Sequence, residues 1–378
     1  MNRIKIIHIL NSVGGVDVSL RLILENIEST KFESIVIHGR DDTKTPYIDN
    51  LGNPVKDYKL PIQRDISVVR DFNAIRETLK IIKKEQPNLI HAHSAKGGII
   101  AKTVTTFLKI PVLHTPQAYS FLSAENIFKK KIFLFVEKLF IGSNNKILAS
   151  STSEQNRAVK EVGYPIEKAL LFNNSINPIS KIEPLSIPKT WPDNYICSVG
   201  RPSFQKNIEL MLDVLAEIKT SINDIHLVLM GVGYHAPNLE EVNKKIKRLN
   251  LGPNITLLEW TSRADIFNII KASKLYLTTA RYEGLPYSVI ESLALGKPIV
   301  ATDADGNRDL VEEGYNGHLI FNENISELAD AVVGIINCDK KNNEFTNNSL
   351  KMFYNKFDIT KNIKILEEIY IKNKKIKK

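Results

Sequence analysis

Short apolar segments alternate with longer amphipathic segments along this chain, and no other feature of the sequence constrains the fold as strongly. Ile4–Leu10 is a short apolar run, a glycine turn follows it, and Val18–Glu28 then has apolar residues at helical spacing. Strands that alternate with helices form βαβ units with parallel strands. The sequence therefore predicts an α/β fold.

The alternation occurs twice and is interrupted once. Strands are predicted at 4–10, 34–38, 89–92, 110–114 and 146–149, and helices at 18–28, 71–84, 96–108, 125–140 and 152–162. Further strands are predicted at 195–199, 225–230, 255–258, 275–278 and 298–301, and helices at 207–219, 239–249, 264–271 and 287–294. The segment from Asn177 to Pro192 has little periodicity and is rich in proline, which is typical of a linker. We therefore expect two β/α units joined by a hinge.

The composition limits the class of protein. The chain has 378 residues, of which 43% are hydrophobic and 25% are charged, as in an ordinary globular protein. Cys197 and Cys338 form no paired motif, so we expect neither a disulfide framework nor a cysteine zinc site. The apolar run at the N-terminus is too short for a signal peptide, and no segment approaches roughly 18–20 uncharged apolar residues. We expect a cytoplasmic protein.

The formal net charge of +9 has two possible explanations: an anionic binding partner, or a bias in the overall amino-acid composition. Heavy use of Ile, Lys and Asn is typical of an AT-rich genome, which raises basic charge without a functional cause. No segment has the pattern of a nucleic-acid-binding module, so we expect no nucleic acid partner. The segment Phe128–Phe140, with Lys129–Lys131 at one end, fits two alternatives: a helix on an anionic membrane surface, or a core helix with a solvated lysine edge.

Ligands of open α/β sheets bind beyond the carboxyl ends of the strands, so residues just after strands are the candidate site residues. Gly14 and Gly15 follow the first predicted strand. Glycines there would let the main chain approach a ligand closely at the start of the next helix, but a tight strand-to-helix turn explains them equally well. Arg201 and Lys206 follow the first strand of the second unit. Two cations there suit a diphosphate, although each alone is also an ordinary surface charge.

A pair of carboxylates follows the strand predicted at 275–278. Glu283 lies in the loop and Glu291 lies eight residues later on the predicted helix. Gly284 and Pro286 shape the turn between them and leave backbone N–H groups at the helix start. Since carboxylates accept hydrogen bonds from vicinal hydroxyls, this spacing favours a sugar and a ribose as ligands.

The segment Glu283–Thr302 resembles the E-x7-E signature of the retaining glycosyltransferases of family 4, which have the GT-B fold. The resemblance continues in chain order. It includes Gly14-Gly15, Val199-Gly200-Arg201 with Lys206, Met230-Gly231-Val232-Gly233, and Asp305-Gly306-Asn307 followed by Gly314 and Gly317. It implies two Rossmann-like domains facing a central cleft. They are an acceptor-side domain at 1–180 and a nucleotide-sugar domain at 181–355, and a C-terminal helix at 356–378 packs back on the first domain and ends in a Lys-rich tail.

The resemblance also implies roles for single residues. The catalytic group would be Glu283, against the transferred sugar, with Arg201 and Lys206 on the donor diphosphate. Glu291 would hold the ribose. The remaining donor contacts would be Gly14, Gly15, Gly231, Gly284, Leu285, Pro286, Tyr287 and Ser288. Retaining transfer in this family is described as a front-face reaction in which the leaving phosphate takes the acceptor proton, so a protein base is not essential. By the resemblance, we expect no cofactor and no essential metal.

The sequence departs from the family pattern at one loop. Members often have a histidine after the strand that ends here at Leu113, and Gln117 occupies that position. Gln117 can donate a hydrogen bond to a sugar hydroxyl but cannot titrate. His114, three residues earlier, is either a sugar or acceptor contact or a packed strand-end histidine.

Two short patterns suggest metal ligands. His91 and His93 are on the same side of a strand and could chelate a metal, but no further ligand set follows them in sequence. We expect them to line the site or to pack, with His93 as a candidate acceptor contact. Asp303-Ala304-Asp305 matches a D-x-D metal motif of another glycosyltransferase fold, but its context here is a strand-end loop.

The predicted function is retaining transfer of a hexose or N-acetylhexosamine from a nucleotide sugar, and the resemblance favours a UDP-sugar. The predicted acceptor is a saccharide or a polyprenyl-diphosphate-linked saccharide, in bacterial capsule, O-antigen or exopolysaccharide synthesis. A peripheral position at the inner face of the cytoplasmic membrane would fit such an acceptor. The alternatives are a GT-B-fold nucleotide-sugar epimerase and a non-catalytic sugar-nucleotide-binding protein.

Overall fold

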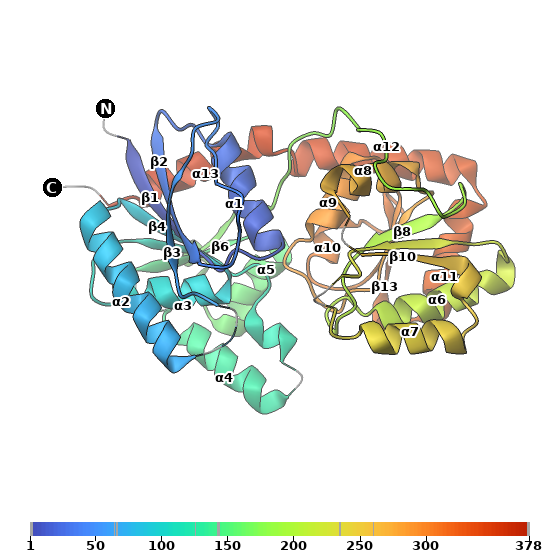
Figure 1. The fold of residues 1–378 in the computed structure, drawn as a ribbon, viewed down its shortest axis with the longest axis horizontal. Coiled ribbons are helices and arrows are strands. Elements are labelled where there is room, and N and C mark those ends of the chain that lie inside the picture. The colour runs from blue at the N-terminus through green and yellow to red at the C-terminus, as the bar shows by residue number, and fades with distance from the viewer. Residues whose placement is uncertain are drawn as a thin grey trace. The chain divides into compact units, whose positions relative to one another are not determined.

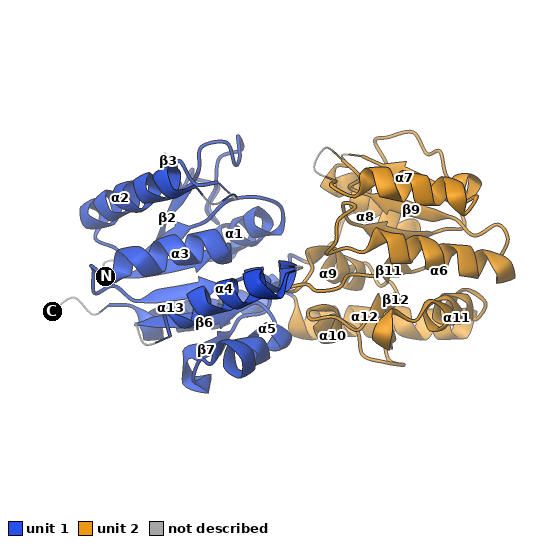
Figure 2. Cartoon of the chain, turned by 90° about the horizontal axis from the view of Figure 1, so that it is seen from below, with its two compact units in different colours: residues 1–177, 358–378 blue, residues 178–357 orange. Residues whose placement is uncertain are grey.

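The computed structural model describes residues 3–63, 65, 67–124, 126–141, 144–233, 236–259 and 261–375. The chain forms two compact units (Figure 2). Unit 1 contains Met1–Asn177 and Asp358–Lys378, and unit 2 contains Pro178–Phe357. The chain therefore passes from one unit to the other twice.

Unit 1 is a parallel sheet with helices on both faces (Figure 1). Its strands are β1 (Ile4–Ile9), β2 (Phe32–Gly39), β3 (Lys56–Leu60), β4 (Leu89–His93), β5 (Val112–Thr115), β6 (Asn145–Ala149) and β7 (Ala169–Leu171). Its helices are α1 (Gly15–Asn26), α2 (Val68–Glu85), α3 (Ser94–Thr105), α4 (Ile127–Lys138), α5 (Thr152–Arg157) and α13 (Ile359–Asn373). A π-helical turn, η2 (Ala158–Val162), continues α5, and short 3-10 turns are η1 (Ser120–Ser123) and η3 (Ile166–Lys168).

The seven strands lie in the order β3-β2-β1-β4-β5-β6-β7. The order reverses between β1 and β4, which pair with His8 opposite His91. The loops after β1 and β4 leave the sheet in opposite directions at that point, which is where such folds bind ligands. Burial of β1, β2 and β4 between two helix layers accounts for their nearly continuous apolar runs.

Unit 2 has the same architecture. Its strands are β8 (Ile196–Val199), β9 (Leu227–Met230), β10 (Ile255–Leu258), β11 (Tyr276–Thr278), β12 (Ile299–Thr302) and β13 (Gly317–Ile320). Its helices are α6 (Ile208–Ser221), α7 (Leu239–Arg248), α8 (Arg263–Ala272), α9 (Tyr287–Ala294), α10 (Asn307–Leu310), α11 (Ile325–Ile336) and α12 (Asp339–Lys356), with 3-10 turns η4 (Gly252–Asn254) and η5 (Phe321–Glu323). The six-stranded parallel sheet has the order β10-β9-β8-β11-β12-β13, so its reversal lies between β8 and β11. The expected α/β class with two Rossmann-like domains is confirmed.

The differences from the expected elements have local causes. Strand β3 has charged, exposed residues at the edge of its sheet, and β7 has only three residues, so neither has a readable apolar pattern. The predicted helix at 125–140 is α4, and Glu125 lies outside the described residues. The proline-rich segment predicted as a linker belongs to unit 2 from Pro178 onward. Ser186 ties this segment to α8 by donating from its backbone N and its Oγ to Asp265, at 2.7 and 2.6 Å.

Within the part of the chain that the structure describes, none of the helices has both the length and the apolar character needed to cross a membrane. The Lys-rich tail predicted at the C-terminus lies partly outside the described residues, which end at Lys375.

Two glycines within helices, one in each unit, give a matched test of packing. A Cβ on Gly97 in α3 would lie 2.3 Å from the Ile9 carbonyl oxygen of β1, whereas a Cβ on Gly334 in α11 would meet nothing within 4 Å. Gly97→Ala should therefore lower the free energy of unfolding by about 2 kcal/mol or more, because the helix must move off the sheet. Gly334→Ala should raise it by about 0.5–1 kcal/mol through helix propensity. Thermal and urea unfolding measure both, and equal effects of the two changes would contradict the packing of α3 on β1.

Candidate active site

In unit 2, hydrogen bonds join the loop after β8 to the loop after β11. The backbone N of Arg281 donates to the Gln205 carbonyl at 2.8 Å, and Thr279 Oγ1 donates to the Asn207 carbonyl at 2.9 Å. The Arg281 guanidinium also lies over the Phe204 ring, at 4.5 Å from its centroid. The strand-order reversal puts these loops next to each other, and their mutual bonds hold them as one rigid segment.

Two of the predicted catalytic residues meet across these loops. Lys206 Nζ lies 2.7 Å from Glu283 Oε1, and Gln205 Nε2 donates to Glu283 Oε2 at 3.0 Å. The Lys206 side chain lies against Gly200, since a Cβ on that glycine would approach its Cγ and Cδ to 3.2 Å. A compact cation is thus held beside a buried carboxylate at the end of the central strand.

Arg201 and Gly231 both adjoin Gly200: Arg201 follows it in the chain, and a Cβ on Gly231 would lie 3.9 Å from its backbone. Arg201 is half-buried and directly follows Gly200 at the end of β8. Gly231 follows β9 with φ +85°, a conformation that side chains of L-residues rarely adopt, and its N donates to the Leu258 carbonyl at 2.9 Å. The backbone at this corner is therefore fixed by conformation as well as by hydrogen bonding.

The turn from Glu283 into α9 is closely packed. Gly284, Leu285 and Pro286 are buried, and α9 begins at Tyr287 with Pro286 as its N-cap residue. Ser288 is bonded to the Tyr276 hydroxyl at 2.9 Å, and that hydroxyl also accepts from Val199 N at 3.1 Å. A buried tyrosine thus links the end of β8 to the first turn of α9, whose N-terminus favours an anion.

Glu291 lies one turn further along α9, in a buried position. Its Oε1 is 2.9 Å from Arg263 Nη2, at the first residue of α8. Burial raises the pKa of Glu291 to about 6, although the Arg263 charge acts in the opposite direction. This carboxylate is therefore held ready to accept hydrogen bonds, at an energetic cost that its partner only partly offsets.

The loop after β12 supports Glu283 from behind. The Asp305 carbonyl accepts from Glu283 N at 3.1 Å. A Cβ on Gly306, where φ is +81°, would lie 2.9 Å from Glu283 Cβ. Arg308 pairs with both carboxylates of the D-x-D pattern, with Asp303 at 2.6 Å and Asp305 at 3.1 Å. These two aspartates are thus bound to an arginine.

In unit 1, the glycine loop after β1 is fixed by an aspartate. Asp42 accepts from Asn11 Nδ2 at 2.8 Å, from the backbone N of Ser12, and from Gly39 N at 3.0 Å. Gly14 has φ +60° and is the N-cap of α1, and Gly15 is the first residue of that helix. Both glycines are exposed, and the positive φ is the reason for a glycine at position 14.

The loop after β5 carries the residue that departs from the family pattern. Gln117 and Ala118 have φ +53° and +75°, which is unusual for residues other than glycine. Both polar atoms of the Gln117 amide lack solvent exposure and have no hydrogen-bond partner among the described residues. An amide left in this state is a candidate ligand contact.

His114 and His93 have different surroundings. His114 is fully buried, its Nε2 bonds the Ser94 carbonyl at 3.0 Å, and a Cβ on Gly98 would lie 2.3 Å from that nitrogen. These contacts support the packing alternative for His114. His93 is equally buried, and its Nδ1, like that of His114, has no hydrogen-bond partner among the described residues.

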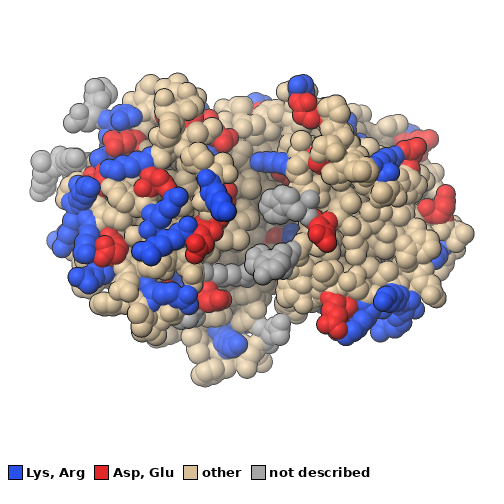
Figure 3. All heavy atoms as spheres, in the orientation of Figure 1, with Lys and Arg blue, Asp and Glu red and all other residues tan. Residues whose placement is uncertain are grey.

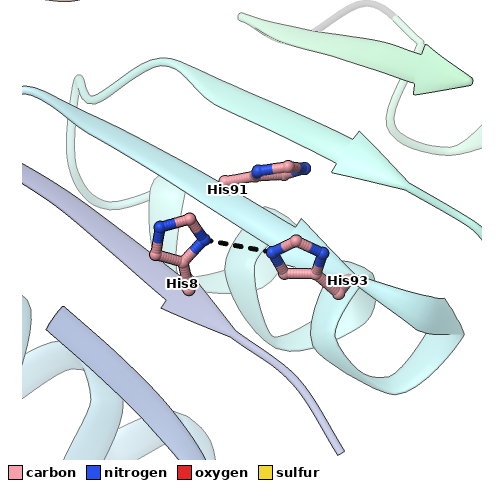
Figure 4. Close-up of side chains that lie close together, drawn as sticks. All are labelled: His8, His91 and His93. Carbon is pink, nitrogen blue, oxygen red and sulfur yellow. Dashed lines mark hydrogen bonds between the residues drawn. The ribbon is translucent and has the colours of Figure 1, made fainter. Parts of the chain in front are cut away.

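A third histidine completes a cluster that the sequence pattern does not reveal. His8 of β1 joins His91 and His93 of β4, and His8 Nδ1 lies 3.1 Å from His93 Nε2 (Figure 4). His91 bonds the Tyr370 hydroxyl through Nδ1 at 2.7 Å and Thr115 through Nε2 at 2.9 Å. Burial lowers the pKa of His8 to about 3 and those of the other two imidazoles well below the ordinary value. The rings are neutral, and His91 could ligate a metal only by giving up one of its two bonds.

Comparisons with known families cover both units. The family described as Glycosyl transferases group 1 matches residues 183–352, and Glycosyltransferase Family 4 matches residues 13–178. The chain is a GT4-like glycosyltransferase.

Relatives and solved structures match along nearly the full length of this glycosyltransferase. The UDP-Gal:alpha-D-GlcNAc-diphosphoundecaprenol alpha-1,3-galactosyltransferase of Escherichia coli is 26% identical, over 98% of this chain and 97% of that protein. The capsular polysaccharide biosynthesis glycosyltransferase CapM of Staphylococcus aureus is 21% identical, over 94% of each chain. Sucrose-phosphate synthase of Thermosynechococcus elongatus has a TM-score of 0.83 at 17% identity, covering 98% of this chain and 99% of that one. Anabaena Alr3699/HepE in complex with UDP-glucose has a TM-score of 0.77 at 18% identity, covering 97% and 99%. These structural likenesses support the GT-B fold.

Several residues that contact the candidate site residues were not anticipated from sequence. Gln205 is a neighbour of Lys206 in the chain and could have been suspected. No sequence pattern indicated Arg263 or Tyr276. Each contacts a candidate site residue that is distant in the chain, Glu291 and Ser288 respectively, and only the fold brings them together.

Replacing the buried carboxylate of Glu291 should change stability in a pH-dependent way. Its pKa is about 6 in the folded protein and 4.5 ordinarily. Above pH 6 the folded protein therefore holds a buried, ionised carboxylate, which lowers the free energy of unfolding. The difference corresponds to about 2 kcal/mol. Glu291→Gln should therefore raise the free energy of unfolding at pH 7.5 by up to that amount, and the gain should shrink as the pH falls from 6 to 4.5.

Thermal unfolding from pH 4.5 to 8 measures this effect. Glu312→Gln, at an exposed position of the same unit, is the matched control and should be neutral throughout. A Glu291→Gln protein that is less stable than the wild type at pH 7.5 would show that the Arg263 pair outweighs the cost of burial.

Proposed function

We propose that this glycosyltransferase moves a hexose or N-acetylhexosamine from a UDP-sugar, with retention of configuration, to a saccharide or polyprenyl-diphosphate-linked saccharide. The product would enter a bacterial capsule, O-antigen or exopolysaccharide. The observation that carries the proposal is the Lys206–Glu283 pair, fixed on two cross-bonded loops with Glu291 on the following helix. The name of the Escherichia coli relative supports a UDP-sugar donor and a lipid-diphosphate acceptor.

The donor would exchange internal contacts of unit 2 for its own. Its diphosphate would take Lys206 and Arg201 as counter-charges, so Lys206 would stabilise the negative charge that grows on the leaving group. Glu283, steadied by Gln205, would accept hydrogen bonds from the transferred sugar. Glu291 would accept the ribose hydroxyls, with Arg263 keeping it ionised. These cations and the N-terminus of α9 would supply the positive charge of the site, and we expect no essential metal.

Retention requires that the acceptor oxygen attack the anomeric carbon on the face from which the diphosphate leaves. The bond to the phosphate oxygen breaks as the new glycosidic bond forms, and the acceptor proton passes to that departing oxygen. Gln117 cannot take a proton at neutral pH, which suits a reaction in which the leaving group is the base. Its amide would hold a sugar hydroxyl in place.

Helix α4 has the surface expected of a membrane contact in unit 1. Phe128, Ile132, Phe135 and Leu139 follow one another at helical spacing and are exposed, the first to 70%. Lys129–Lys131 flank this stripe, while the opposite side packs through Phe133 and Leu134 and through a buried Lys102–Glu137 ion pair at 3.0 Å. Basic side chains gather over α2 in Figure 3, and the surface around α4 is mostly uncharged there.

We infer that this apolar stripe and its lysines dock on an anionic lipid surface, where a polyprenyl-linked acceptor would be embedded. Apolar side chains that enter the headgroup region and lysines that pair with anionic lipids act together in such contacts. Of the two alternatives for this segment, exposure of the stripe supports the membrane surface, although one side of the helix is packed.

Removal of the Lys206 charge tests the catalytic proposal. Lys206→Ala should lower kcat/KM for sugar transfer about 10²–10³-fold, because a group that stabilises developing charge is lost. Lys244→Ala, at an exposed ion pair on α7, should leave kcat/KM unchanged. The assay combines a panel of UDP-sugars with a lipid-diphosphate-sugar acceptor, and NMR of the product reads the anomeric configuration.

Four outcomes would contradict the proposal. The first two are an inverted product and full activity of Lys206→Ala. The third is a new UDP-sugar formed without acceptor, which would indicate an epimerase. The fourth is UDP binding without turnover on any acceptor, which would indicate a non-catalytic protein.

Membrane docking is tested with vesicles. The triple change Phe128→Ser, Phe135→Ser and Leu139→Ser should weaken sedimentation with phosphatidylglycerol vesicles at least about tenfold, because three apolar side chains no longer enter the lipid. Phe107→Ser, at another exposed phenylalanine of unit 1, is the matched control. Equal effects of the control and the triple change, or binding that persists in the triple variant, would overturn the assignment of α4.

A further inference from the structure

The turn after β5 is held in a conformation that its own residues disfavour. Gln117 and Ala118 are consecutive and both lie in the left-handed region, with φ +53° and +75°. Each non-glycine residue in that region costs conformational energy and persists only where its surroundings impose it. Something outside the turn must therefore stabilise it.

The buried carboxylate of Glu154 makes the contact that does so. Its Oε1 accepts from the backbone N of Ala118 at 2.8 Å. Its Oε2 accepts from the backbone N and the Oγ of Ser150, at 2.7 and 2.8 Å. Glu154 itself sits in the first turn of α5, where its own N donates to the capping Ser151 Oγ at 3.0 Å. One carboxylate thus ties the turn after β5 to the segment between β6 and α5.

The chain just beyond the turn is anchored as well. Tyr119 and Phe121 are buried, with ring centroids 5.1 Å apart, in a cluster with Ile147, Ala149 and Tyr164. Between this anchor and β5, the Gln117 amide has no partner among the described residues and no exposed polar atom. The turn is therefore fixed on both sides of a polar group that is itself unsatisfied, and such a group is left to be completed by a ligand.

We propose that Glu154 is a positioning residue for sugar transfer, which holds the turn at Gln117 and Ala118 left-handed and so presents the Gln117 amide preformed to a substrate hydroxyl. This inference rests on the proposed function for the role of Gln117. Its physical basis is preorganisation: a contact group that is already ordered costs less to bind, and a small misplacement costs rate. Glu154 touches no substrate and acts through the turn alone.

The test compares three changes around one helix start. Glu154→Ala should lower kcat/KM roughly tenfold or more, while Glu154→Gln, which keeps one acceptor oxygen, should lie between it and the wild type. Ser151→Ala removes the cap of α5 but leaves the bond from Ala118 N to Glu154, so its kcat/KM should stay within about twofold. If Glu154→Ala fails to fold, Glu154→Gln carries the comparison.

Two further variants separate positioning from a merely structural role. Glycine adopts a positive φ without strain, so Ala118→Gly should restore much of the activity lost in Glu154→Ala and should be silent in the wild type. Combining Gln117→Ala with Glu154→Ala should be no worse than Gln117→Ala alone, because Glu154 acts through Gln117. The proposal would be overturned if the losses of kcat/KM from Gln117→Ala and Glu154→Ala multiplied in the double variant. It would also be overturned if Ala118→Gly did not restore the activity lost in Glu154→Ala.

Amide hydrogen exchange of residues 117–119 tests whether Glu154 holds the turn, without any assay of sugar transfer. The Ala118 amide should be protected in the wild type and in Ser151→Ala, and should exchange markedly faster in Glu154→Ala. Unchanged protection would overturn the inference even in an active enzyme. If Glu154→Ala clearly loses this protection while the wild type transfers no sugar, Glu154 does hold the turn and the proposed function is wrong.

Discussion

The bonds between the loops after β8 and β11 are the constraint on which the rest of the site depends. A lysine and a carboxylate on separate surface loops would lose considerable side-chain freedom on pairing, and such exposed pairs contribute little. Here Arg281 N and Thr279 Oγ1 fix the backbone around Lys206, and the Asp305 carbonyl fixes Glu283. The pair is therefore a consequence of backbone order, and the backbone order follows from the reversal of strand order at that point.

Buried carboxylates recur in both units, each beside a cation or a set of N–H donors. Glu283 has Lys206, Glu291 has Arg263, and Glu137 has Lys102. Glu154 accepts hydrogen bonds from the backbone N–H groups of Ala118 and Ser150 and from the Ser150 hydroxyl. Isolated buried charges are costly, so each partner lowers the cost of burying the carboxylate that it contacts. The cations that pair with Glu283 and Glu291 are partly exposed, at 22% for Lys206 and 43% for Arg263, so a charged ligand could reach them. Both members of the Lys102–Glu137 pair are buried.

The fold could be predicted from the sequence because its signals are local. Apolar runs marked the central strands, and the spacing of Glu283 and Glu291 placed one carboxylate in a loop and the other on the next helix, as observed. Residues whose role depends on a distant contact could not be predicted. Arg263 contacts Glu291 only because α8 packs beside α9, and His8 lies near His91 only because β1 pairs with β4. His114 gave an ambiguous pattern because a strand-end histidine reads the same in sequence whether it faces a helix or a ligand.

The return of the chain to unit 1 after Phe357 has a consequence for the order in which the protein forms. Helix α13 contributes Tyr370, fully buried and bonded to His91, and Glu367, which accepts from Glu28 N at 3.1 Å. During synthesis the N-terminal segment leaves the ribosome first, yet its core lacks this helix until nearly the whole chain has been made. Unit 2, which is continuous, can close before unit 1 is complete. The nascent first unit must then persist for most of translation with an uncovered apolar face, where α13 will later pack.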